Sequence, residues 1–144
     1  MSGNKSPRRR AREFVVQGLY QHLVAGQDLP GIEAQAAGVA GFEKGDVGLY
    51  QALLRDTLDG EAELREVLAP HIDRKWEEVS PIERGILLLG ACELKSHPET
   101  PYRVVINEAI ELAKTFGGTD GHKFVNGVLD KLAPELRPHE TQAR

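Results

Sequence analysis

The sequence has a single cysteine, few aromatic residues and no long uninterrupted apolar run. Cys92 has no second cysteine to pair with, so nothing requires an oxidising compartment, and its apolar neighbours favour a buried, inert thiol. No stretch approaches the roughly 20 apolar residues that cross a bilayer. The arginines near the start are not followed by the apolar segment and cleavage site of an export signal. We therefore expect a cytoplasmic protein without a membrane partner.

Motifs of catalysis and metal binding are also missing. The five histidines are scattered, and HExxH, CxxC, GxSxG and Walker-type glycine sequences do not occur. Glu108 and Glu111 could share a helix face, as paired carboxylates do in some hydrolases, but Lys114 nearby favours an ordinary solvated ion pair. We expect no enzyme, no cofactor and no metal. A small hydrolase using His122 or the Glu108 and Glu111 pair is the alternative.

The sequence does contain a strongly uneven distribution of charge. Its net charge is −4, yet residues 1–12 carry no acidic side chain. The basic residues in this stretch are Lys5, Arg8, Arg9, Arg10 and Arg12. A basic end on an acidic body favours a localised site for a polyanion over diffuse adhesion to nucleic acid or membrane.

Helix signals recur along the whole chain and predict an all-α fold of about seven helices. Apolar residues follow a period of 3.6, and Ser-Pro or Gly residues mark most starts and ends. The expected helices cover about residues 7–25, 31–40, 46–68, 81–94, 101–116 and 121–133. The helix at 46–68 is expected to bend or break at residues 59–60. The first half of the chain is therefore expected to form a three-helix unit.

The second half has the clearer local signals. Ser80 and Glu83 form a capping box, and ILLLGACEL (86–94) behind it is apolar nearly all round, which predicts a central helix. Asp120 is expected to cap the last helix, and Pro134 to end it. We expect the polar tail after Leu136 to be loose.

Three stretches together resemble one protein family. PYRVVINEAIELAKTFGGTDGHKFVNGVLDKLAP (101–134) closely resembles the C-terminal signature of the bacterial transcription antitermination factor NusB family, and RRRAREFVVQGLYQ (8–21) resembles its arginine-rich motif. VSPIERGILLLGACEL (79–94) fits between them. The resemblance implies a single all-helical domain over 1–144, made of two packed three-helix groups at about 7–70 and 71–136, without catalysis.

The resemblance also implies a function and partners. Members bind the single-stranded boxA element of ribosomal RNA leaders together with the small-subunit ribosomal protein NusE. The pair joins RNA polymerase and other Nus factors, so that ribosomal operons are transcribed without premature termination. Some relatives form homodimers, and this stays open here. Residues 26–46 match the family only as a helical spacer, so no function is assigned to them.

Other functions remain to be weighed against this one. The same helical module serves ribosomal RNA cytosine methyltransferases, but 144 residues leave no room for their cofactor domain. An adaptor that binds only proteins, with the arginines gripping an acidic partner, is the other alternative.

Two basic groups are expected to bind RNA, and folding is expected to bring them together. Cations at a helix start bind phosphates, and flat side chains stack on bases. The expected RNA-binding residues are Lys5, Arg8, Arg9, Arg10 and Arg12 in the first group, and His122, Lys123 and Phe124 in the second. Tyr20 is expected to contact the protein partner or RNA. Glu83 matches a family position associated with the protein partner, so the resemblance implies that it contacts this partner. Core packing is the alternative role of Tyr20 and Phe124, and capping is that of Glu83.

Overall fold

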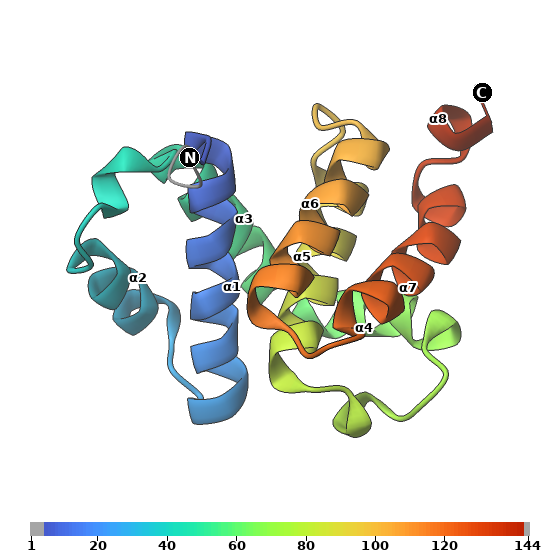
Figure 1. Ribbon diagram of the computed structural model, residues 1–144, viewed down its shortest axis with the longest axis horizontal. Coiled ribbons are helices and arrows are strands. Elements are labelled where there is room, and N and C mark those ends of the chain that lie inside the picture. The colour runs from blue at the N-terminus through green and yellow to red at the C-terminus, as the bar shows by residue number, and fades with distance from the viewer. Residues whose placement is uncertain (1–4, 143–144) are drawn as a thin grey trace.

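The computed structural model describes residues 5–142, and within them it is made of helices and connecting turns without a strand (Figure 1). The helices are α1 (Pro7–Ala25), α2 (Leu29–Ala37), α3 (Val47–Asp59), α4 (Glu61–Leu68), α5 (Pro81–Ser96), α6 (Tyr102–Phe116), α7 (Gly121–Leu136) and α8 (Pro138–Gln142). Short 3-10 turns lie at Phe42–Lys44, Ala69–His71 and Trp76–Glu78. The predicted all-α class is confirmed, and none of the described helices is long and apolar enough to cross a bilayer.

Helix α5 is the centre of the fold, as its composition predicts. Pro81 starts it, and the Ser80 hydroxyl accepts a hydrogen bond from the Glu83 amide at 3.3 Å. Every residue from Gly85 to Leu94 is buried, because α5 packs against α1, α3, α4, α6 and α7. Gly90 allows the close approach of α7, since a Cβ there would lie 2.9 Å from a methyl of Leu129. Because α5 contacts both halves, the division of the chain near residue 70 stays a prediction.

The first half folds around one face of α1. Ser6 caps α1 by accepting a hydrogen bond from the Arg9 amide at 3.1 Å, and Gly26 ends it in the left-handed region at φ 68°. The inward face of α1 consists of Ala11, Val15, Val16 and Leu19. The expected break between residues 59 and 60 occurs, because Gly60 separates α3 from α4. The helix expected at 31–40 begins earlier, where Asp28 caps α2.

The end of the chain differs from the sequence prediction in three ways. Helix α7 continues through Pro134 to Leu136; the proline lies in the last turn, and the amide of Arg137 closes that turn on the Ala133 carbonyl at 2.7 Å. Asp120 occupies the position before α7, but its side chain accepts no capping hydrogen bond, and its carboxylate lies 3.6 Å from the Lys123 ammonium. The tail is not loose up to Gln142, where it forms α8.

Arg137 holds this tail against the core. Its buried guanidinium donates hydrogen bonds to the backbone carbonyls of Leu94 at 2.6 Å, Glu93 at 3.0 Å, and His97 and Thr100 at 3.0 and 3.1 Å. The last carbonyls of a helix lack partners within the helix, so the arginine satisfies groups at the end of α5. The same guanidinium also bonds the carboxylate of Glu140, which accepts a hydrogen bond from the Tyr102 amide at 2.7 Å.

Replacing Arg137 by methionine should lower the free energy of unfolding by about 3 kcal/mol, because buried carbonyls lose their donor. Urea unfolding followed by circular dichroism measures the change. Arg55→Met is the matched control: Arg55 lies on the surface in an ion pair with Glu33, and its loss should cost less than about 1 kcal/mol. Equal stability of the two variants would contradict the role given to Arg137.

Candidate nucleic-acid interface

The amino end of α1 carries the first basic group on its surface. Pro7 and the Ser6 cap start the helix directly before the arginines, so the positive end of the helix dipole adds to their charge. Lys5 forms an ion pair with Glu13 at 2.8 Å, and the exposed Arg8 donates a hydrogen bond to the Thr100 hydroxyl at 3.3 Å. Arg10 is half-buried next to the turn at residue 45. These side chains combine cationic charge with access to solvent.

Arg9 joins this end of α1 to α6. Its guanidinium donates two hydrogen bonds to the Glu108 carboxylate, at 3.2 and 2.8 Å, and these raise the pKa of Arg9. The Arg9 side chain is still 37% exposed. A phosphate can therefore reach it by taking over one of its hydrogen bonds to Glu108.

The paired carboxylates of α6 are both occupied by cations. Glu108 holds Arg9, and Glu111 contacts Lys114 at 3.6 Å. Within residues 5–142, no group of three or more histidine, cysteine or acidic side chains is placed to hold a metal ion. This arrangement favours the ion-pair interpretation of Glu108 and Glu111 over the hydrolase alternative.

Arg12 does not belong to the surface group, which corrects the sequence prediction. Its side chain is 2% exposed and donates two hydrogen bonds to the buried carboxylate of Glu93 in α5, at 2.9 and 2.8 Å. Burial acts to lower the pKa of Arg12, but the hydrogen bonds and charge of Glu93 outweigh it and leave that pKa raised. The guanidinium that would bind a phosphate already donates its hydrogen bonds to Glu93. Arg12 therefore positions α1 and does not face a ligand.

The second basic group lies at the start of α7. His122 and Phe124 are half-buried, and Lys123 is exposed and contacts Asp120. The guanidinium of Arg74 lies 4.3 Å from the centre of the Phe124 ring. Phe124 therefore has one face covered by a cation, and Arg74 adds positive charge to this group.

Sequence patterns could not identify Arg74 as part of this site. It lies in the connection between α4 and α5, outside any periodic segment, and only the fold places it on a side chain 50 positions later in the sequence. Asp73 next to it bonds the Arg74 guanidinium at 2.9 Å, and this hydrogen bond lowers the pKa of Asp73.

Glu83 and Tyr20, the predicted partner contacts, lie in α5 and α1. A Cβ on Gly121 would lie 2.5 Å from a Glu83 carboxylate oxygen, so Glu83 packs against the first residue of α7. Tyr20 is 42% exposed and so is not a core residue. It lines a hollow of about 610 Å³ with Gln17, Gln21, Ile82 and Phe116. Tyr20 thus lines a partly apolar hollow, and Glu83 follows Ile82, another residue of its lining, in the sequence.

Folding does not bring the two basic groups into contact, contrary to the sequence prediction. Arg8 contacts Thr100 in the connection before α6, and Arg9 contacts Glu108 in the first half of α6. Helix α7, in contrast, starts just after α6 ends. Figure 1 shows α1 and α6 running in the same direction, with the start of α7 at their far end. The 15 residues of α6 span about 22 Å at 1.5 Å per residue. A ligand that touches both groups must be extended.

Replacing Arg12 by methionine should cost about 3–5 kcal/mol of unfolding free energy, because Glu93 is left as an uncompensated buried charge. The double variant Arg12→Met with Glu93→Leu should regain most of this loss, since no charge then remains buried. Urea unfolding of both single variants and the double variant measures the coupling. Additive losses, without recovery in the double variant, would contradict the pairing.

Comparison with proteins of known sequence identifies close relatives. The NusB family model matches residues 9–134. The transcription antitermination protein NusB of Dechloromonas aromatica is 57% identical over 140 residues, which cover 97% of this chain and 86% of that protein. The protein of the same name from Burkholderia cenocepacia is 55% identical over 140 residues, which cover 97% of each chain.

Solved structures agree with this relationship. T. maritima NusB has a TM-score of 0.79 at 29% identity, covering 96% of this chain and 99% of that one. A crystal structure of antitermination factors NusB and NusE in complex with dsRNA has a TM-score of 0.74 at 21% identity, covering 90% and 97%, and this likeness shows the fold alone. The chain therefore belongs to the NusB family.

Proposed function

We propose that this protein is a transcription antitermination factor that binds single-stranded boxA RNA of ribosomal RNA operons together with the ribosomal protein NusE. The complex then joins RNA polymerase and other Nus factors and keeps transcription of ribosomal RNA genes processive. One observation carries the proposal: cationic side chains lie on the surface at the start of α1. The NusB family model matches the chain from residue 9 to residue 134, and this supports the same function. The relatives' shared name, transcription antitermination protein, supports the same function.

The RNA strand is extended along α6 in this proposal. Lys5, Arg8, Arg9 and Arg10 bind phosphates at one end, and His122, Lys123 and Phe124 bind the strand at the other. Planar guanidinium groups suit phosphate oxygens, and an aromatic ring with one free edge or face can contact a base. The two groups lie towards opposite ends of α6, which is about 22 Å long, and this arrangement suits an unpaired strand that follows the surface.

The protein partner binds the hollow beside this path. Tyr20 supplies an exposed aromatic ring with a hydroxyl, and Glu83, which follows the lining residue Ile82, supplies a carboxylate at the first residue of α7. Aromatic side chains in partly apolar hollows are frequent anchors of protein interfaces. NusE bound there would lie next to the RNA, so that it can hold the strand together with this protein.

RNA binding by the isolated protein should be weak and strongly dependent on salt, and it should tighten when NusE is added. Four phosphates neutralised by the α1 group give a slope of log affinity against log salt of roughly −3, at about 0.7 per phosphate. Replacing Arg8 and Arg10 by alanine should reduce the slope to about −1.5 and weaken binding at least tenfold. Anisotropy of labelled boxA RNA at several salt concentrations measures both quantities.

Arg55→Ala is the matched control for this titration, because Arg55 lies on α3 in an exposed ion pair. It should leave the slope unchanged. A flat salt response of the unaltered protein would count against RNA as the ligand. Absence of RNA binding combined with tight, salt-dependent capture of an acidic protein would favour the alternative of an adaptor that binds only proteins.

Glu83→Lys should weaken NusE binding at least tenfold, because a carboxylate at the hollow becomes a cation. Tyr20→Ala should act in the same direction by removing the aromatic anchor. Neither change should weaken RNA binding by the protein alone. Calorimetric titration with NusE, alongside the RNA titration, separates the two effects; unchanged NusE affinity in both variants would place the partner elsewhere.

A further inference from the structure

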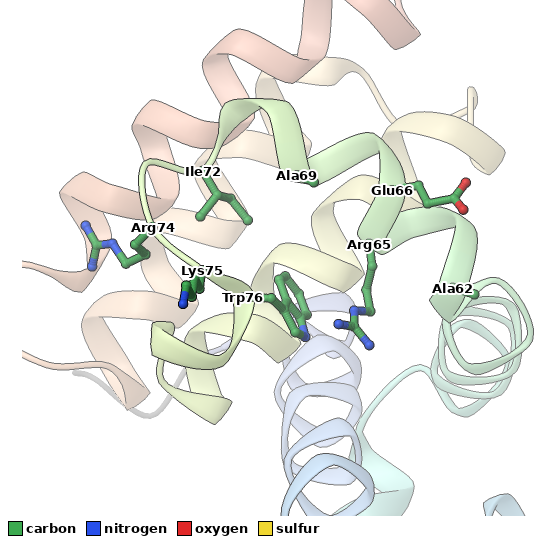
Figure 2. Close-up of a pocket in the computed structure, with 8 residues that line it drawn as sticks. All are labelled: Ala62, Arg65, Glu66, Ala69, Ile72, Arg74, Lys75 and Trp76. Carbon is green, nitrogen blue, oxygen red and sulfur yellow. The ribbon is translucent and has the colours of Figure 1, made fainter.

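A second hollow lies between α4 and the start of α5, away from the Tyr20 hollow. It has a volume of about 460 Å³, and its lining includes Arg65, Ala69, Ile72, Arg74, Lys75 and Trp76. Figure 2 shows the Trp76 ring and the Arg65 guanidinium next to each other, with Glu66 directed away from them. The hollow therefore combines a flat aromatic ring and aliphatic side chains with three cations.

Two carboxylates next to this hollow form ion pairs with its arginines, and Glu66 in its lining is directed away from Trp76. Asp73 bonds Arg74 at 2.9 Å, and Glu77 lies 3.9 Å from Arg65. Both carboxylates are about three-quarters exposed, so water screens their charge. Arg65 also lies 5.3 Å from the centre of the Trp76 ring, which holds the guanidinium at the ring.

Arg74 makes the hollow continuous with the start of α7. The same side chain lines the hollow and covers the Phe124 ring at 4.3 Å. In Figure 2 it points from the loop towards α7. A strand that reaches Phe124 from the α1 end therefore meets Arg74 next, and Trp76 lies behind it on the same loop.

We propose that the loop between α4 and α5 extends the RNA path: Arg74 binds the strand as it leaves Phe124, and the hollow at Trp76 receives a base from the flanking RNA. This inference rests on the proposed function, since it adds a third contact to the same strand. A base suits the hollow because its flat ring can stack on Trp76 while Lys75 and Arg65 contact phosphates at the rim. An aliphatic peptide would bring no anion to these cations, whose neighbouring carboxylates Asp73 and Glu77 are exposed to water.

Trp76 is the one tryptophan of the sequence, so its fluorescence reports on this hollow alone. The probes are three labelled single-stranded RNAs: the boxA element, and the same element with four extra uridines at either end. One extended RNA should quench Trp76 fluorescence and bind at least fivefold more tightly than boxA alone, within the range of base stacking on an aromatic ring. The unextended RNA should leave the fluorescence nearly unchanged.

Variants assign the effect to the named side chains. Arg74→Ala and Trp76→Leu should each remove the gain from the extension, whereas Trp76→Phe should keep much of it, because phenylalanine still stacks. Arg55→Ala should bind every RNA as the unaltered protein does. Circular dichroism checks that each variant is folded.

The outcomes distinguish this inference from the proposed function. Binding of all three RNAs with equal affinity and with unchanged Trp76 fluorescence overturns the third contact, while the proposed function stands. Absence of binding to any RNA, with or without NusE, overturns both. Quenching of Trp76 by NusE alone, without an effect of the RNA extension, assigns the hollow to the protein partner and overturns the RNA contact.

Discussion

The buried ion pair between Arg12 and Glu93 fixes α1 against the central helix, and the position of the basic surface depends on it. A buried charge without its partner costs several kcal/mol, so packings of α1 and α5 that separate the two groups are disfavoured. With Arg12 directed into α5, the neighbouring Arg9 reaches α6 and Arg8 reaches Thr100. One buried contact thus sets which side of α1 each arginine occupies.

The sequence predicts features that depend on local patterns. Ser6 and Ser80 cap the helices that they precede, and the apolar run after Glu83 is buried on all sides. These predictions succeed because a cap requires only residues three apart, and a helix that is apolar all round has to be buried wherever it packs. The break at Gly60 follows from equally local chemistry.

The errors at Arg12 and in the C-terminal tail involve partners that are distant in the sequence. In the sequence, Arg12 resembles the surface arginines around it. Only the fold brings Glu93, 81 positions later, into contact with it. Arg137 reads as part of a polar tail, but its donors match carbonyls at the end of α5. A charge pattern carries no information about depth, and a buried arginine is identified only by the acceptors that surround it.

The separation of the two basic helix starts limits which ligand the surface suits. A compact anion would contact only one of the two basic groups, and the other group would add nothing to its affinity. A flexible strand can use both groups, because its charges repeat along its length, and the cations of α1 and of α7 lie towards opposite ends of α6. The hollow at Tyr20 lies near the far end of this path, beside the last residue of α6, so a protein seated there contacts the strand without displacing it from α1. In the proposed function, the geometry gives a physical reason for binding RNA and a protein at the same time, because the basic groups and the hollow at Tyr20 are separate surfaces.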